Sequence, residues 1–281
     1  MLDHFEGRVA VITGGGSGIG AALAKACAAE RMNVVVADID PSRAEAVAAA
    51  IKGSAAGVLA IGVDVSDPAS VESGAAQVDR TFGAPDLLCN NAGVSPLGLL
   101  WDFAPEDWNW VIGVNVLGVA NCIRSFVPRM IAAGRGGHIV NTASNAALNS
   151  EPRLGAYCAT KHAVLGLSDS LRVDCAPYNI GVSVLCPGGV ATNISQTLTR
   201  RSSVDPAKDL AADLEVFMAG TDEALGITID PDVVAALVMR GVRDGAPYIV
   251  TAPGLKPVVA RRYDTILGAF DEARRINPDL P

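Results

Sequence analysis

Short apolar runs recur along the chain and alternate with longer segments of helical character. Seven of these runs have the character of strands, at residues 8–13, 33–38, 57–65, 85–90, 137–143, 180–186 and 247–251. Their hydrophobicity is nearly continuous, which is typical of strands buried on both faces of a parallel sheet. The pattern therefore predicts an α/β fold in which a doubly wound, mostly parallel, seven-stranded sheet is flanked by helices.

Three segments depart from a simple alternation of strands and helices. A long helix is predicted over residues 107–133, with Pro128 near its end, where a missing amide donor would bend the last turns. Residues 193–230 are polar and then helical, and they indicate an insertion that serves as a lid over the substrate. Residues 255–276 have the pattern of a last amphipathic helix. We expect a single domain, residues 1–281, that includes all three segments.

The charge balance argues against nucleic acid as a partner. The net charge is −8, from 22 basic and 30 acidic residues, whereas affinity for a phosphate backbone comes from clustered Lys and Arg. The first residues lead straight into a strand without the features of a targeting signal. No apolar run approaches the ~18 residues of a membrane span. We therefore expect a cytoplasmic protein that binds neither nucleic acid nor membranes.

The cysteines show no metal-binding spacing. There is no CxxC pair, and no histidine cluster accompanies them, so we expect no metal site. Reduced and mostly buried thiols fit this pattern best. The six cysteines are Cys27, Cys89, Cys122, Cys158, Cys175 and Cys186.

A glycine-rich turn follows the first predicted strand and opens a helix. Its sequence is TGGGSGIG at residues 13–20. Glycines there permit positive φ and close backbone approach, while the helix N-terminus offers free amides to a pyrophosphate. A glycine turn that merely connects two elements is the alternative, but the strand–turn–helix context favours a dinucleotide site of the Rossmann type.

Asp38 closes the second predicted strand, eighteen residues after Gly20. A carboxylate there can accept both hydrogen bonds of the adenosine ribose diol and would repel a 2′-phosphate. No Arg or Lys stands next to it in the sequence, and Ser17 occupies a loop position where a basic residue could have received that phosphate. NAD is therefore the expected cofactor. The alternative is an ordinary Asp that caps the following turn.

Tyr157 and Lys161 lie four residues apart in a predicted helix, so their side chains project from one face. A phenol with its ordinary pKa of about 10 is a poor base at neutral pH. A neighbouring ammonium and the positive charge of an oxidised nicotinamide both favour the phenolate. The pair therefore suits alcohol oxidation, although the same spacing also occurs in surface Tyr/Lys pairs.

Taken together, these motifs resemble those of the short-chain dehydrogenases/reductases, in order and in spacing. The resemblance covers about residues 6–192 and fades in the insertion at 193–230. The residues that carry it are the turn TGGGSGIG, Asp64-Val65, Asn90-Asn91-Ala92-Gly93, Asn115, Ser144, Tyr157 with Lys161, and Pro187-Gly188.

The resemblance implies four catalytic positions. Tyr157 would be the acid/base, and Ser144, thirteen positions earlier, would hold the substrate oxygen. Lys161 would grip the nicotinamide ribose and lower the pKa of Tyr157. Asn115 would support a chain of water that leads protons from Lys161 to solvent. A turn-forming serine and a buried asparagine bonded only to backbone are the alternatives for Ser144 and Asn115.

The resemblance also implies the cofactor contacts. The adenosine half would meet the glycine turn, the second strand end and the loop after the fourth strand, and the carboxamide would meet the stretch after the sixth. The residues are Gly14, Ser17, Gly18, Ile19, Gly20, Asp38, Asp64, Val65, Asn91, Ala92, Gly93, Tyr157, Lys161, Pro187, Gly188, Val190 and Thr192.

The expected activity is transfer of a hydride between a secondary alcohol and NAD, with Tyr157 taking the hydroxyl proton and no metal involved. Two alternatives stay open. The same residues could reduce a ketone with NADH or NADPH, or the chain could be a non-catalytic dinucleotide-sensing module, because fold alone never fixes activity. All three of Ser144, Tyr157 and Lys161 are present, which favours an enzyme.

Substrate and assembly are less well defined by the sequence. The C-terminal tail resembles that of family members acting on bulky aromatic or alicyclic secondary alcohols. Relatives commonly form dimers or tetramers through two long helices, here residues 105–133 and 155–178. Aromatic clusters are more often core than ligand cage. The candidate pocket residues are Trp101, Phe103, Trp108, Trp110, Leu148, Leu154, Phe217 and Met218.

Overall fold

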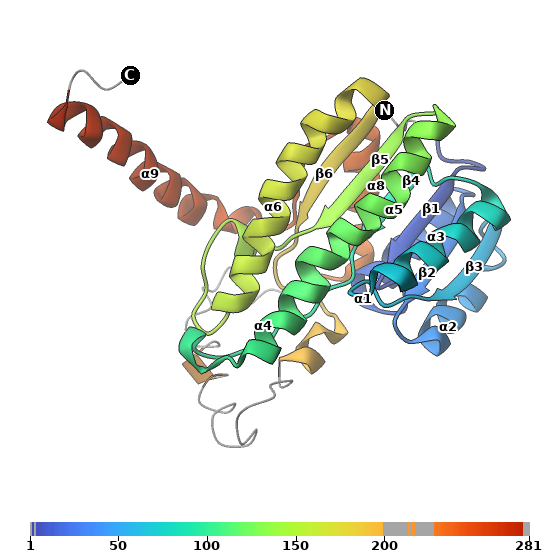
Figure 1. The fold of residues 1–281 in the computed structure, drawn as a ribbon, viewed down its shortest axis with the longest axis horizontal. Coiled ribbons are helices and arrows are strands. Elements are labelled where there is room, and N and C mark those ends of the chain that lie inside the picture. The colour runs from blue at the N-terminus through green and yellow to red at the C-terminus, as the bar shows by residue number, and fades with distance from the viewer. Residues whose placement is uncertain (1, 3, 199–212, 214, 217–227, 278–281) are drawn as a thin grey trace.

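A seven-stranded parallel sheet forms the centre of the computed structural model, which describes residues 2, 4–198, 213, 215–216 and 228–277. The strand order is β3-β2-β1-β4-β5-β6-β7, and every strand pair is parallel. The chain reverses its direction of progress between β1 and β4, which are neighbours in the sheet (Figure 1). The strands are β1 (Val9–Thr13), β2 (Asn33–Asp38), β3 (Gly57–Gly62), β4 (Leu87–Asn90), β5 (Gly137–Thr142), β6 (Ile180–Cys186) and β7 (Tyr248–Val250).

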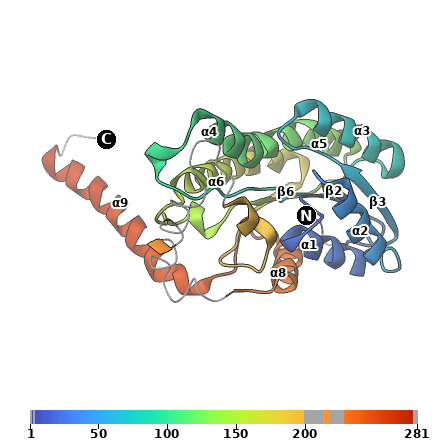
Figure 2. The same ribbon diagram turned by 90° about the horizontal axis from the view of Figure 1, so that it is seen from below.

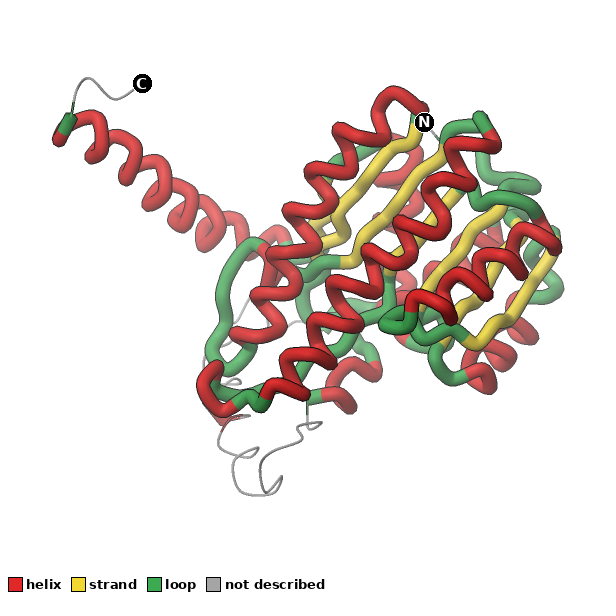
Figure 3. The backbone as a smooth tube through the Cα atoms, in the orientation of Figure 1, coloured by secondary structure: helices red, strands yellow, loops and turns green. Residues whose placement is uncertain are grey.

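Helices cover both faces of the sheet, so the strands form a middle layer (Figures 2 and 3). One core cluster joins the sheet to α1, α2 and α8, and a second joins it to α3, α5 and α6. The helices are α1 (Gly18–Ala29), α2 (Pro41–Ile51), α3 (Pro68–Phe82), α4 (Pro105–Ile112), α5 (Gly118–Ala133), α6 (Gly155–Cys175), α8 (Pro231–Asp244) and α9 (Lys256–Ile276).

Strand β1 shows why the apolar runs are continuous. Ala10 and Ile12 belong to the core cluster under α1 and α8, whereas Val9 and Val11 belong to the cluster under α3 and α5. Successive side chains of a strand point to opposite faces, so a strand covered on both faces must be apolar at every position. Each fully buried side chain such as Ile12 contributes roughly 1.5–3 kcal/mol.

The long helix of the sequence pattern is interrupted. It begins at Pro105 rather than at residue 107, and a π-helical segment, Gly113–Leu117, separates α4 from α5. Pro128 lies inside α5, which continues to Ala133. By length and composition alone the stretch Pro105–Ala133 could cross a membrane, a criterion that the core helices of soluble proteins also meet.

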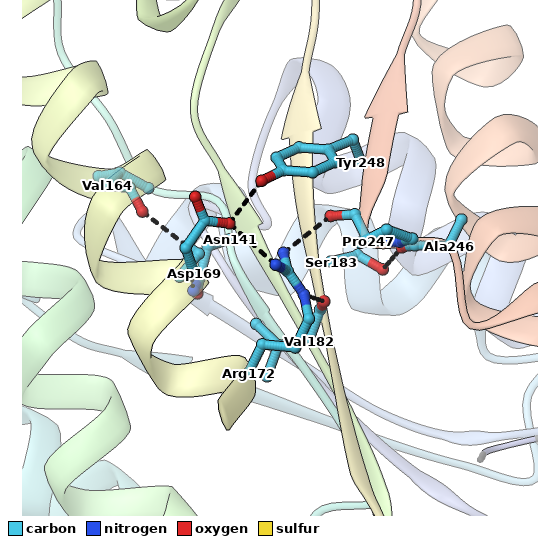
Figure 4. Close-up of polar contacts among 10 residues, drawn as sticks. Asn141, Val164, Asp169, Arg172, Val182, Ser183, Ala246, Pro247 and Tyr248 are labelled. Carbon is cyan, nitrogen blue, oxygen red and sulfur yellow. Dashed lines mark hydrogen bonds and ion pairs between the residues drawn. The ribbon is translucent and has the colours of Figure 1, made fainter. Parts of the chain in front are cut away.

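A polar cluster fastens α6 to the edge of the sheet (Figure 4). The Arg172 guanidinium donates to the carbonyl oxygens of Val182 and Pro247, at 3.0 and 3.1 Å. It also pairs with Asp169 at 2.9 Å, and the Tyr248 hydroxyl donates to the same carboxylate at 2.7 Å. These contacts link α6 to β6 and β7 and thereby fix the helix that carries Tyr157 and Lys161.

Helix α9 extends away from the body of the molecule (Figures 1 and 2). It confirms the helical pattern of residues 255–276, and none of its 21 residues is buried. Near its start, the Arg262 guanidinium lies 2.8 Å from His162 Nε2 of α6. The predicted lid falls mostly outside the described residues, which include from it a short 3₁₀ helix, Asn193–Thr197.

All six cysteines are buried and free. Burial raises the pKa of Cys27, Cys122 and Cys186 to about 12 because the thiolate is poorly solvated there. These thiols therefore behave as small apolar side chains.

Candidate active site

A cavity of about 580 Å³ opens at the carboxyl ends of the strands, where the sheet order reverses. Open α/β sheets bind their ligands at this point. All the predicted site residues line the cavity except Gly20 and Asn115. Those that line it are Gly14, Ser17, Gly18, Ile19, Asp38, Asp64, Val65, Asn91, Ala92, Gly93, Ser144, Tyr157, Lys161, Pro187, Gly188, Val190 and Thr192.

The glycine turn joins β1 to α1 in a conformation that side chains would oppose. Gly14 and Gly18 have φ of +61° and +49°, where a Cβ is strained. Gly20 lies behind the turn rather than in the cavity, because a Cβ there would be 2.1 Å from the carbonyl oxygen of Gly14. Its role in the structure is to let α1 pack closely against the loop, while Gly14 and Gly18 face the cavity.

Asp38 is buried at the end of β2 with both carboxylate oxygens engaged. Oδ2 accepts from the Gly16 amide at 2.9 Å, and Oδ1 accepts from the Asp40 amide at 3.0 Å. The second contact is the turn cap that the alternative interpretation proposed. Asp38 nevertheless lines the cavity, and each oxygen keeps a lone pair for a further donor.

Arg43 is a basic neighbour of Asp38 that sequence adjacency did not reveal. It lies in the first turn of α2, lines the cavity, and pairs with Asp40 at 3.3 Å. A Cβ on Gly16 would lie 2.6 Å from the Arg43 Cβ. No Arg or Lys adjoins Asp38 in the sequence, as stated above, but α2 folds back against the glycine turn and brings Arg43 to the same part of the cavity.

The loop after β4 is held against the glycine turn. The Asn91 side chain donates to the carbonyl oxygens of Thr13 and Gly14, at 3.1 and 3.3 Å. The Thr13 hydroxyl accepts from the amides of Asn91 and Ala92 in return. Thr13 thus fixes one wall of the cavity. It belongs to the glycine-rich motif, but the motif did not predict this role.

Tyr157 and Lys161 project from the first turns of α6 into the cavity. The Lys161 ammonium donates to the Thr142 carbonyl oxygen at 2.9 Å and lies 5.5 Å from the centroid of the Tyr157 ring. Both side chains are buried. Burial lowers the pKa of Lys161 to about 8, since the ammonium loses its hydration there.

The pKa of Tyr157 differs from the sequence expectation. Burial raises it to about 12, against the lowering effect of a hydrogen bond with Ser144, and the nearby Glu151 raises it further. Lys161 is not among the causes of this shift, so the expected lowering is not found in the protein alone, where desolvation penalises a phenolate strongly.

Ser144 ends the loop after β5 and caps a 3₁₀ helix, Asn145–Ala147. Its hydroxyl donates to Asn145 Oδ1 at 2.9 Å and accepts from the Ala146 amide at 3.1 Å. Asn145 Nδ2 in turn donates to Glu151 Oε1 at 3.0 Å. Asn145 and Glu151 both line the cavity, and no motif had singled them out. Burial raises the pKa of Glu151, and the bond from Asn145 opposes this.

Asn115 lies in the π-helical segment and is fully hydrogen-bonded. Its side chain donates to the Val94 carbonyl oxygen at 2.9 Å and to Thr160 Oγ1 at 3.0 Å, and accepts from the Val94 amide at 2.9 Å. These bonds join the loop after β4 to α6. These contacts fit the alternative of a buried structural asparagine, except that one partner, Thr160, is a side chain and not backbone. π-helical turns are frequent at functional sites.

The predicted aromatic pocket is only partly formed. Trp110 and Leu154 line the cavity. Phe103 and Trp108 contact each other edge to face, with ring centroids 6.1 Å apart, and Trp101 is 78% exposed. The spacing along the chain could not show that these rings point in different directions. Leu148 packs in a core cluster, and Phe217 and Met218 lie outside the described residues.

A family model described as short chain dehydrogenase matches residues 8–203. The chain belongs to this family. It is an oxidoreductase family, and membership confirms the resemblance inferred from the motifs. The fold expected from the sequence, a doubly wound Rossmann-type sheet, is confirmed as well.

Known members of the family extend the comparison. C alpha-dehydrogenase of Sphingobium sp. (strain NBRC 103272 / SYK-6) is 34% identical over 270 residues, which cover 95% of this chain and 87% of that protein. A short-chain dehydrogenase/reductase from Burkholderia phymatum, solved in complex with NAD, has a TM-score of 0.86 at 37% identity and covers 94% of this chain and 95% of its own. A short chain dehydrogenase from Mycobacterium paratuberculosis bound to NAD has a TM-score of 0.78 at 26% identity and covers 89% of this chain and 97% of its own.

The residues present fit a dinucleotide cofactor. The glycine turn exposes the start of α1, whose unpaired amides favour a pyrophosphate. Asp38 stands where a ribose diol can donate to it, and the cavity runs from there to Tyr157. The roles of the individual site residues stay predictions.

Proposed function

We propose that the protein is an NAD-dependent oxidoreductase that interconverts a secondary alcohol and its ketone, with Tyr157 as the acid/base. The observation that carries this proposal is the convergence of Ser144, Tyr157 and Lys161 on one cavity, which also reaches the glycine turn and Asp38. When bound, the nicotinamide supplies the acceptor for the hydride that leaves the carbinol carbon.

The chain's own part is to hold the substrate oxygen and move its proton. Tyr157 takes the hydroxyl proton of the alcohol, and Ser144 lies beside it to fix the substrate oxygen. Lys161, tied to the Thr142 carbonyl oxygen, is held next to the phenol ring. Its positive charge favours the phenolate, although burial of Tyr157 opposes this in the protein alone. Asn115 supports the start of the chain of water that leads protons from Lys161 to solvent.

NAD is proposed over NADP because Asp38 would repel a 2′-phosphate. Arg43 is the feature that favours the alternative, since it lines the same part of the cavity, but its pairing with Asp40 offsets its charge. Reduction of a ketone with NADH or NADPH by the same residues is therefore the second candidate function. A non-catalytic sensing module is the third, and it would tolerate loss of Tyr157.

We propose a bulky aromatic or alicyclic substrate. The apolar side chains of Val94, Trp110, Leu154 and Leu198 line the cavity together with the catalytic residues. The similarity to C alpha-dehydrogenase supports a dehydrogenase reaction without defining the substrate.

A homodimer or homotetramer in the cytoplasm is also proposed, with no nucleic acid or membrane partner. The surface along α4, α5 and α6 would form the contact, and it exposes Ile112, Leu117 and Val173. Light scattering that shows a stable monomer would contradict this part.

The decisive experiment follows NADH absorbance over a panel of secondary alcohols, and the reverse reaction over the matched ketones, with NAD and NADP cofactors. We expect turnover with NAD, and a loss of about 10³-fold in Tyr157→Phe with cofactor affinity retained. Tyr178→Phe, at an exposed tyrosine, is the matched control. Near-normal turnover in Tyr157→Phe would refute the proposed role.

A further inference from the structure

Three side chains form a row of hydrogen bonds along one wall of the cavity, and Tyr157 lies next to the end of that row. Ser144 is close enough to Tyr157 to affect the pKa of the phenol. Ser144 Oγ lies 2.9 Å from Asn145 Oδ1, and Asn145 Nδ2 lies 3.0 Å from Glu151 Oε1. All four residues line the cavity. The row thus leads from the neighbour of the proposed acid/base to a carboxylate outside the family's motifs.

The direction of this row is set at the glutamate end. An ionised carboxylate can only accept hydrogen bonds, so Asn145 must present its amide nitrogen to Glu151 and its oxygen to Ser144. The single hydroxyl proton of Ser144 is then directed to Asn145. One lone pair of Ser144 accepts from the Ala146 amide, at 3.1 Å, and the other is left facing the cavity.

We propose that Glu151, acting through Asn145, is a positioning residue that holds Ser144 as a hydrogen-bond acceptor toward the cavity, for the hydroxyl of either Tyr157 or a bound alcohol. This inference rests on the proposed function of Ser144 and Tyr157. A bound alcohol can donate its hydroxyl proton to this acceptor before Tyr157 removes the proton, whereas a ketone has no such proton to donate. The row therefore favours a bound alcohol over a bound ketone.

The hydrogen bond from Asn145 is the main polar contact of the Glu151 carboxylate among the described residues. Among the ion pairs of the described residues, none includes Glu151. Glu151 faces Tyr157 and Cys158, both on α6. The positive charge of Arg262, on α9, also acts on Cys158. The adjacent Arg153 pairs with Asp213 at 3.1 Å. Asn145 is thus the polar partner that fixes the carboxylate.

A double-mutant cycle separates this role from a plain charge effect. Ionisation of Tyr157 is followed by ultraviolet difference absorbance of the NAD complex up to about pH 11, each protein being compared with its own Tyr157→Phe version. Glu151→Gln removes a negative charge and also frees the Asn145 amide to turn. Ser144 can then donate to the phenolate, so the pKa of Tyr157 falls. In the Asn145→Ala background only the charge effect remains.

We expect Glu151→Gln to lower the pKa of Tyr157 by about one unit more when Asn145 is present than in the Asn145→Ala background. Equal shifts in both backgrounds, or no shift, would overturn the positioning role. Glu106→Gln, the same charge change at an exposed position at the start of α4, should give no shift. Melting temperatures verify that each variant is folded.

A second readout uses an alcohol and ketone pair from the substrate panel. The equilibrium constant of the reaction is the same for every variant, so the effect must appear as a split between KM and kcat. Glu151→Gln should lower KM for the ketone relative to KM for the alcohol by about tenfold, because Ser144 can then donate to the carbonyl. An unchanged KM ratio would contradict the proposal. If Tyr157→Phe stays active, the proposed function fails; if only the coupling is missing, the positioning role alone fails.

Discussion

The two ends of the cavity are built in different ways. At the cofactor end, backbone atoms form much of the site, and glycines and hydrogen bonds from side chains to the backbone hold them, as at Gly14, Gly20 and Asn91. At the substrate end, side chains form the site, and other side chains hold them, as in the row from Ser144 to Glu151.

This difference explains why the cofactor end can be identified from sequence motifs. A backbone that must approach a phosphate tolerates only glycine at defined positions, so the constraint is visible in the sequence. Tyr157, Lys161 and Ser144 belong to motifs, but the side chains that support them, such as Asn145 and Glu151, can be of many residue types and so carry no signature. The comparison implies that changes at the cofactor end damage binding and folding together, whereas changes at the substrate end alter selectivity.

The largest effect is expected for Gly20→Ala at the cofactor end. Its Cβ would lie 2.1 Å from the Gly14 carbonyl oxygen, a backbone atom that cannot move aside without displacing the whole turn. We expect a loss of NAD affinity of about 100-fold and destabilisation of about 1–3 kcal/mol. Isothermal calorimetry and thermal melting measure the two. Gly166→Ala in α6, where a Cβ meets nothing within 4 Å, is the control. Normal NAD affinity in Gly20→Ala would contradict the view that glycines hold the backbone at the cofactor end.

An intermediate effect on stability is expected for Lys161→Met, which lies between the two ends of the cavity. The lowering of the Lys161 pKa from 10.5 to about 8 corresponds to roughly 3 kcal/mol of burial cost at neutral pH. Losing the bond to Thr142 returns about 1 kcal/mol of that. The variant should therefore be inactive yet more stable, with a melting temperature about 5 °C higher.

The pH dependence of this gain has a defined sign. Below about pH 8 the lysine is charged in both the folded and the unfolded state, so its burial cost is fully present. The gain of Lys161→Met should shrink as the pH rises from 8 toward 10.5, where the lysine becomes neutral in both states. Lys25→Met, at a side chain 60% exposed, should show no such trend. A gain independent of pH would show that packing, not charge, is responsible.

The smallest effect is expected for Trp110→Ala at the substrate end. The indole lines the cavity, so its loss should raise KM for bulky substrates by about tenfold and leave NAD affinity unchanged. Steady-state kinetics with bulky and small alcohols measure this. Trp101→Ala, at a side chain 78% exposed, is the matched control. An equal change for small and bulky alcohols would count against a pocket role.

The central strands could be predicted because they are buried on both faces and so leave continuous apolar runs, whereas the edge strands β3 and β7 are only partly buried. The boundaries were less accurate where burial ends gradually. Strand β3 stops at Gly62, although apolar residues continue to Val65, because Val63 and Val65 pack from the following loop. The π-helical segment at Gly113–Leu117 has no sequence pattern of its own.

The residues that sequence reasoning missed act through contacts between distant parts of the chain. Arg43 reaches the glycine turn because α2 folds back, and Thr13 becomes important through the loop after β4. Asn145 follows Ser144 directly and could have been suspected as a polar neighbour, but its link to Glu151 depends on the loop before α6. Periodicity and spacing describe local geometry, and these contacts are not local.

Because all six thiols are buried, their reaction with an alkylating reagent would measure local opening of the native fold. Only a thiolate attacks an alkylating reagent, and burial keeps these groups protonated and inaccessible, so each reacts only when its surroundings transiently separate. The six sites sample α1, β4, α5, both ends of α6, and β6. Labelling of Cys158, next to Tyr157, would report local opening of α6 beside the cavity, and labelling of Cys89 would report exposure of the central strands. Neither measurement needs an introduced probe.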